Sequence, residues 1–116
     1  MNTIDPYNEK RPWGEFTKFT QNTPSTVKII VVHPHEALSL QYHHHRAEFW
    51  YVISGTGTAE INGEHITLSP GTTVSISPTV LHRVTADNAP LTFLEIATGD
   101  FDENDIVRTE DRYHRT

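Results

Sequence analysis

The chain has 116 residues and a mass of 13.2 kDa, which is enough for one compact domain but not for two that each bury a core. Nine lysines and arginines against fifteen aspartates and glutamates give a formal net charge of −6, which argues against a general nucleic-acid-binding protein. The chain contains no cysteine, so disulfides, thiolate metal sites and cysteine nucleophiles are excluded.

The N-terminal residues 1–24 are expected to form an ordered arm with one or two short edge strands, because Pro6, Pro12 and Pro24 disfavour a helix. Residues 1–11 carry no apolar run of the kind found in signal peptides, and no stretch of about 18 apolar residues could span a bilayer. We therefore expect a cytoplasmic protein with no membrane partner. Residues 25–116 are expected to form one β-barrel.

Short β-rich segments separated by Gly and Pro turns follow the arm. The first, Val27–Val32, is mostly apolar and is interpreted as a buried strand. The strongest hairpin signal is Asn62-Gly63, because these residues tolerate the positive φ angles of a type I′ turn. The other expected strands are Leu38–Tyr42, Phe49–Ile53, Gly57–Ile61, Glu64–Leu68, Thr73–Ser77, His82–Ala86 and Leu91–Ala97. This spacing predicts an all-β sandwich or barrel, and the acidic tail from Gly99 onward could hold a helical turn or a last strand.

Eight histidines are the one oddity of the composition, and three of them are consecutive. Such a run can be an exposed polar turn, but its neighbours favour a site. In a strand, side chains at i and i+2 share a face, so Gln41 and His43 point the same way. A turn at Arg46-Ala47 would bring Glu48 back beside His43, and His82 could arrive on a neighbouring strand. An amide oxygen, two imidazoles and a carboxylate form a donor set for a catalytic divalent metal ion.

Two stretches of the chain resemble the motifs of the cupin family. The first has ligands at i and i+2, a Glu and then a Gly, here Gln41, His43, Glu48 and Gly55. The second runs from Gly71 to His82. Where the cupin motif usually has its first histidine, this chain has Gln41, and a Gln-x-His pair with Glu and a later His is similar to the zinc set of type I phosphomannose isomerases.

A narrower resemblance covers about nine-tenths of the chain, to the type II mannose-6-phosphate isomerase domain. In many relatives that domain is the C-terminal half of a bifunctional enzyme whose other half is a mannose-1-phosphate guanylyltransferase, an activity that we do not carry over to this chain. The departures from the family pattern are Tyr42, Phe49 and His114. The residues that carry the resemblance are Arg11-Pro12-Trp13-Gly14, Val27-Lys28-Ile29, Leu38 to Trp50, Leu81-His82-Arg83, Asp105 to Arg108 and Glu110-Asp111.

The resemblance implies a single-domain cupin, a jelly-roll barrel also called a double-stranded β-helix. It further implies interconversion of mannose 6-phosphate and fructose 6-phosphate through an enediol, a step of GDP-mannose biosynthesis. That chemistry requires a Lewis acid, which a metal ion on Gln41, His43, Glu48 and His82 would supply. Zinc is the expected ion, with cobalt, manganese or nickel as alternatives.

The same chemistry requires a base and a cation for the phosphate. The candidate bases are Lys28, His44, His45 and Glu95. Lys28 and Glu95 interrupt apolar strands, which is costly unless they face a polar cavity. Arg46 is expected in the catalytic site as well, and Arg46, Arg83 and Arg108 are the candidates to bind the phosphate. Strand alternation leaves open whether Arg83 points out of the barrel instead.

Three other functions are compatible with a cupin of this kind. They are a metal-dependent oxygenase, another sugar isomerase or epimerase, and a sugar-binding module without catalysis. Iron oxygenases favour all-histidine or histidine–carboxylate sets over a glutamine ligand, which favours the isomerase. We also expect a homodimer, because a small β-rich domain has sheet edges to cover.

Overall fold

The computed structural model describes residues 4–115, which form strands and connecting loops and contain no helix in that range. The strands are β1 (Tyr7–Arg11), β2 (Gly14–Lys18), β3 (Ser25–Val32), β4 (Leu40–Tyr42), β5 (Arg46–Ser54), β6 (Gly57–Ile61), β7 (Glu64–Leu68), β8 (Thr73–Ile76), β9 (His82–Ala86), β10 (Leu91–Gly99) and β11 (Val107–Glu110). Within the same range, no helix is therefore long and apolar enough to cross a bilayer.

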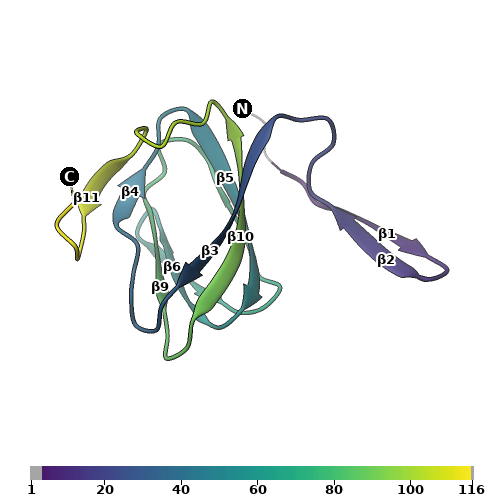
Figure 1. The fold of residues 1–116 in the computed structure, drawn as a ribbon, viewed down its shortest axis with the longest axis horizontal. Coiled ribbons are helices and arrows are strands. Elements are labelled where there is room, and N and C mark those ends of the chain that lie inside the picture. The colour runs from purple at the N-terminus through teal and green to yellow at the C-terminus, as the bar shows by residue number, and fades with distance from the viewer. Residues whose placement is uncertain (1–3, 116) are drawn as a thin grey trace.

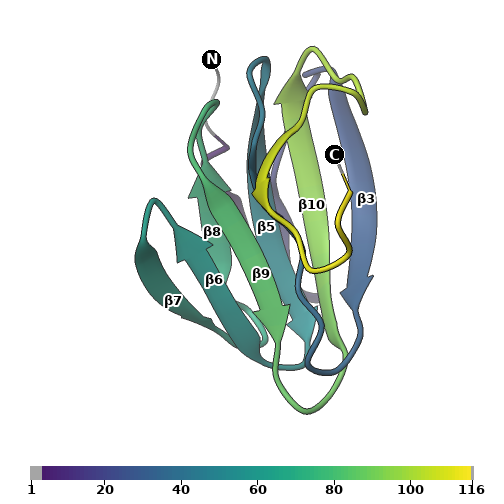
Figure 2. The same cartoon turned by 90° about the vertical axis from the view of Figure 1, so that its left-hand side faces the viewer.

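Two antiparallel sheets face each other and enclose the core (Figure 1, Figure 2). One has the strand order β3-β10-β5-β8 and the other β11-β4-β9-β6-β7. Side chains alternate between the two faces of a strand, so one face of each strand contributes to the core. The buried apolar cluster consists of Val32, Trp50, Val52, Ala59, Leu68, Val74, Ile76, Val84, Ala86, Leu91 and Phe93. The prediction of an all-β barrel is confirmed.

The β1–β2 hairpin projects away from the barrel and forms a two-stranded sheet of its own (Figure 1). After the hairpin the chain returns to the barrel. There the ring of Phe19 packs against those of Phe49 and Tyr51, with centroid distances of 5.6 and 5.8 Å. Trp13, in the turn of the hairpin, is exposed. The division of the chain into an arm and a barrel at residue 24 stays a prediction.

Strand β3 corrects the expectation of a buried strand at residues 27–32. Val27, Ile29 and Val31 are 57%, 66% and 51% exposed, whereas Lys28 lines the cavity inside the barrel. The reason is that no element within residues 4–115 covers the outer face of β3, so only the inward half of its residues is covered. A run of apolar residues in the sequence cannot distinguish a strand buried on both faces from one with an uncovered outer face.

The turn between β4 and β5 lies at His44 and His45, not at Arg46-Ala47 as the sequence indicated. The backbone N–H groups of the two histidines donate to the carboxylate of Asp105 over 2.8 and 2.9 Å. That capping fixes the turn early, and β5 therefore begins at Arg46. The tail contains a last strand, since β11 pairs with β4.

The Asn62-Gly63 turn has positive φ at both residues, 50° and 85°, as predicted for type I′. Gly55 combines a similar φ of 83° with a close approach, because a Cβ there would lie 2.2 Å from the carbonyl oxygen of Pro90. The chain therefore offers two glycines with the same backbone requirement and different surroundings.

We predict that Gly55→Ala lowers the free energy of unfolding by about 3 kcal/mol, because alanine there adds a steric clash to the left-handed backbone. Gly63→Ala is the matched control: a Cβ at Gly63 meets nothing within 4 Å, so the loss should be about 1 kcal/mol. Urea unfolding of both variants measures the difference. Equal losses would contradict the close packing at Gly55.

Candidate metal centre

Three buried side chains from different strands converge inside the barrel. His43 follows β4, Glu48 lies on β5 and His82 opens β9. The Nε2 atom of His43 is 3.3 Å from Glu48 Oε2, and the Nε2 atom of His82 is 3.6 Å from Glu48 Oε1. Their potential ligand atoms all lie within 4.8 Å of one another. This is the cluster that the sequence predicted from spacing.

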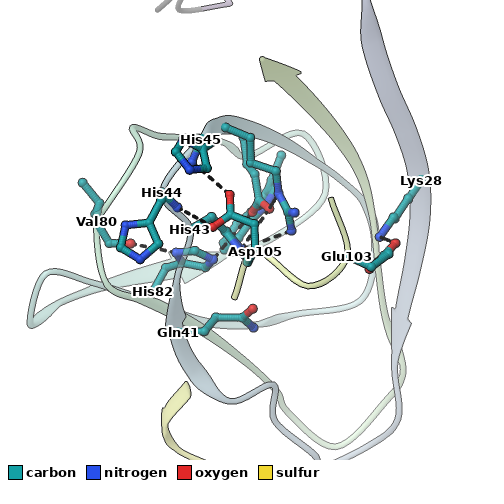
Figure 3. A network of polar contacts seen from close by, with 12 residues as sticks. Lys28, Gln41, His43, His44, His45, Val80, His82, Glu103 and Asp105 are labelled. Atoms are coloured by element: carbon teal, nitrogen blue, oxygen red, sulfur yellow. Dashed lines mark hydrogen bonds and ion pairs between the residues drawn. The ribbon is translucent and has the colours of Figure 1, made fainter. Parts of the chain in front are cut away.

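The far side of each imidazole ring is fixed by a backbone carbonyl. His43 Nδ1 lies 2.6 Å from the carbonyl oxygen of Asp105, and His82 Nδ1 lies 2.9 Å from that of Val80 (Figure 3). A carbonyl oxygen only accepts, so the proton of each ring is on Nδ1 and donates to it. In the neutral ring the lone pair of Nε2 then faces Glu48, as in imidazoles that bind metals.

The protonation states of the cluster favour a metal ion. Burial by itself raises the pKa of Glu48, but the hydrogen bond and charge of protonated His43 and the charges of protonated His82 and of Arg46 outweigh it and lower that pKa to about 2. Burial lowers the pKa of His82. A divalent ion that binds here would replace imidazole protons as the positive charge between the rings and this carboxylate. The donor set therefore fits such an ion.

Gln41 lies on β4 directly opposite His82 of β9 and lines the same cavity. Its Nε2 atom donates to the backbone oxygen of Ser39 over 3.4 Å. Because the nitrogen end of the amide has this partner, the other end, Oε1, is the atom that could bind a metal ion. Figure 3 shows Gln41 below the two histidines.

Arg46 is the cation that the structure brings into the cluster. Its Nε donates to Glu48 Oε2 over 3.1 Å, and its Nη2 donates to His43 Nε2 over 3.3 Å. Its Nη1 donates to the carbonyl oxygen of Asp102 over 3.2 Å, and the guanidinium lies 4.4 Å from the ring centroid of Phe101. Arg46 therefore contacts two of the candidate ligand atoms and compensates the buried charge of Glu48.

The cluster opens into a cavity of about 280 Å³. Besides the residues described so far, Lys28 and Glu95 line it from adjacent strands, where they are direct cross-strand neighbours. Burial and the charge of Glu48 raise the pKa of Glu95 to about 7. The cavity residues are Lys28, Ile30, Leu38, Ser39, Gln41, His43, Arg46, Glu48, Trp50, His82, Glu95, Glu103, Ile106, Arg108 and Arg115.

Two predicted site residues lie elsewhere. Arg83 is absent from the cavity lining and pairs with Glu60 and Glu110 over 2.9 and 3.4 Å, because alternation along β9 puts it on the face opposite to His82. His45 is exposed in the turn, with its backbone held by Asp105. Arg83 and His45 therefore do not line the cavity, so their expected phosphate-binding and catalytic roles stay predictions, and His44 is likewise exposed.

The C-terminal segment contributes residues that the sequence did not assign to the site. Phe101, Glu103, Asp105 and Arg115 contact the cavity or the residues that form it. Asp105 was part of the resemblance, which is the one signal that could have found it. Its role depends on contacts with residues about 60 positions earlier in the chain, and no local pattern indicates those.

Comparisons with known proteins identify the family of this chain. A family model described as "Mannose-6-phosphate isomerase C-terminal" matches residues 5–111. The chain belongs to this family. A mannose-1-phosphate guanylyltransferase, ManC, of Salmonella typhimurium (strain LT2) is 40% identical over 107 residues, which are 90% of this chain and 22% of that protein. The chain thus spans less than a quarter of the length of this curated relative.

Solved structures identify the fold of this member of the mannose-6-phosphate isomerase C-terminal family. A cupin protein from Bacteroides fragilis has a TM-score of 0.62 and 26% identity, and the match covers 66% of this chain and 67% of that chain. The capsular polysaccharide assembling protein CapF from Staphylococcus aureus has a TM-score of 0.69 and 18% identity, covering 92% of this chain and 35% of that chain. The predicted cupin fold is therefore confirmed.

We predict that the protein binds one divalent ion at His43, Glu48 and His82. Titration with Co²⁺ should give a visible absorption band that zinc abolishes by competition and EDTA removes, and His43→Ala or His82→Ala should lose it. His65→Ala is the control, since His65 is exposed on β7. A band that survives both cavity variants, or disappears in the control, would contradict this site.

Proposed function

We propose that this domain is a metal-dependent aldose–ketose isomerase that interconverts mannose 6-phosphate and fructose 6-phosphate through an enediol. The observation that supports it most is one cavity in which a donor set for a divalent ion lies beside a buried carboxyl group, Glu95, and several cations. Membership of the family described above supports the substrate. Since a relative is named mannose-1-phosphate guanylyltransferase, we infer a role in GDP-mannose biosynthesis.

Each residue has a defined task in this proposal. Gln41, His43, Glu48 and His82 would hold the ion, which when bound supplies a Lewis acid for the substrate carbonyl. Glu95 carries the proton between C2 and C1, because it is a buried carboxyl group on the inner face of β10 and reaches the cavity. The ring nitrogens stay oriented by the carbonyl groups of Asp105 and Val80.

Zinc is the ion that we propose, with cobalt, manganese or nickel as alternatives, because imidazole, carboxylate and amide ligands accommodate all four. A cupin oxygenase is the second candidate, since two histidines and one carboxylate also form an iron site. The two functions differ in a simple measurement. Bound iron with oxygen uptake would favour the oxygenase, and a role for Gln41 in metal affinity would favour the isomerase.

We predict that purified protein converts mannose 6-phosphate to fructose 6-phosphate, loses this activity in EDTA and regains it with one of the four metals. Glu95→Gln should lower kcat roughly 100-fold or more, because amide cannot exchange the proton, while the Co²⁺ band is kept. Glu60→Gln, on the outer face of the barrel, is the control and should leave kcat unchanged. No turnover with any metal would refute the isomerase, and sugar binding without turnover would indicate a binding module.

A homodimer is part of the proposal, and the outer face of the sheet that contains β3 supports it. Val27, Ile29, Val31 and Ile53 are exposed there. With strands about 5 Å apart and about 3.3 Å per residue, the face measures roughly 500 Å². A stable interface needs about 800 Å² per partner, which is more than this face provides. In a dimer through this face, the projecting β1–β2 hairpin would therefore have to contribute to the interface as well.

We predict that light scattering after size exclusion gives the mass of a dimer and that Ile29→Lys gives a monomer, because a buried lysine at the interface lacks a partner. Thr67→Lys, exposed on the edge strand β7 of the other sheet, is the control. A monomeric wild-type protein would contradict the dimer. A monomeric Thr67→Lys variant beside a dimeric Ile29→Lys variant would contradict the assignment of the interface to this face.

A further inference from the structure

An ion pair lies at the side of the cavity away from the histidines. The Nζ atom of Lys28 on β3 is 2.8 Å from the Oε1 atom of Glu103, a residue 75 positions later (Figure 3). Both residues line the cavity. The side chains of Lys28 and Glu103 are 34% and 71% exposed, so this pair borders solvent, unlike the buried cluster around Glu48.

Lys28 differs in its surroundings from two other cations of the cavity. Arg46 is bound to Glu48, His43 and the carbonyl oxygen of Asp102 inside the barrel. Arg115 is bound to Asp111 through both Nε and Nη2. The carboxylate that pairs with Lys28, by contrast, is that of Glu103, which is largely exposed and belongs to a loop. An exposed ion pair of this kind contributes little to stability, so an incoming anion of higher charge can replace Glu103.

Phe101 provides a contact that does not depend on Glu103. The ammonium of Lys28 lies 4.7 Å from the centroid of this ring, and the guanidinium of Arg46 lies 4.4 Å from it. Both cations therefore share one aromatic ring, which attracts a positive charge through its face. Lys28 keeps this contact when its carboxylate partner moves away, so its charge stays directed along the cavity wall.

The register of the sheet gives the distance from Lys28 to the candidate metal centre. Lys28 is opposite Glu95, which in turn is opposite Trp50 of β5, and Glu48 lies two residues before Trp50 on the same face. Two strand spacings of about 10 Å in all, combined with about 7 Å along β5, place Lys28 and Glu48 about 12 Å apart at the backbone. In a hexose 6-phosphate the phosphate is at the opposite end from C1 and C2, so a substrate reacting at the histidine cluster would extend its phosphate toward Lys28.

We propose that Lys28 is the residue that binds the phosphate of the substrate, and that Glu103 is an internal anion that occupies Lys28 until the phosphate displaces it. This inference rests on the proposed function for the identity of the sugar, whereas the anion site itself is independent of catalysis. It assigns Lys28 to phosphate binding and not to proton transfer. Glu103 then sets the affinity, because each phosphate that binds must first break the Lys28–Glu103 pair.

The first experiment measures inorganic phosphate binding to the full chain by calorimetry. Glu103→Gln should tighten binding about threefold, since it removes the competing charge. Lys28→Gln should weaken it about tenfold, and Lys28→Arg should restore most of the affinity. Thermal unfolding identifies any variant that fails to fold, in which case the Lys28→Arg and Glu103→Gln pair still tests the proposal.

Glu60→Gln is the matched control, because Glu60 pairs with Arg83 at 2.9 Å outside the cavity and its loss changes the net charge by the same amount. Phosphate affinity should not change in this variant. An equal gain in Glu60→Gln and Glu103→Gln would reduce the effect to net charge and overturn the proposal. Unchanged affinity in Lys28→Gln would also overturn it.

Steady-state kinetics with mannose 6-phosphate separates this proposal from the isomerase itself. Lys28→Gln should raise KM and Glu103→Gln should lower it, both with kcat nearly unchanged. A loss of kcat at constant KM in Lys28→Gln would make Lys28 a proton-transfer residue and refute the phosphate role. Phosphate binding that follows the predicted pattern in a protein without turnover would support the anion site and refute the isomerase.

Discussion

The negative charge of Glu48 lies in the interior of the barrel, where an unpaired carboxylate would cost several kcal/mol. Three side chains offset that cost: His43, His82 and Arg46, which approach within 3.1 to 3.6 Å of its oxygens. His43 and Arg46 flank the turn between β4 and β5, and His82 begins β9, so the partners meet only when both sheets and that turn are in place. The geometry of the site is therefore a consequence of completing the fold.

The site also depends on the C-terminal segment, which holds the residues of the cluster from outside. Asp105 accepts from His43 through its backbone oxygen and from the turn at His44 and His45 through its carboxylate. Asp102 accepts from Arg46. Strand β11 continues the segment by pairing with β4. One short stretch of chain thus holds a histidine, an arginine and a turn in fixed relative positions, and it also forms part of the cavity wall.

Local patterns predicted much of this architecture. Alternation correctly assigned Gln41 and His43 to one face, and the turn chemistry of Asn62-Gly63 was sufficient to predict its hairpin. An expected turn before Glu48 and a neighbouring strand for His82 completed the set, and the resemblance supported it, since alternation alone cannot bring residues together from different strands. The position of the turn at His44 could not be predicted, because it is determined by Asp105, far along the chain. Arg46 was expected in the catalytic site, but its bond to Asp102 was not. Arg83 was ambiguous because its direction depends on which face of β9 is buried.

Strand β3 separates the cavity on its inner side from solvent on its outer side. Lys28 stands on its inner side beside Glu95, while Val27 and Ile29, its immediate neighbours in the sequence, contact solvent on the outer side. An edge strand has hydrogen bonds to only one neighbour, here β10, so its position is restrained from one direction. A molecule that packs against the outer side of β3 would therefore affect the cavity wall directly, because only the backbone of this strand lies between that surface and the cavity.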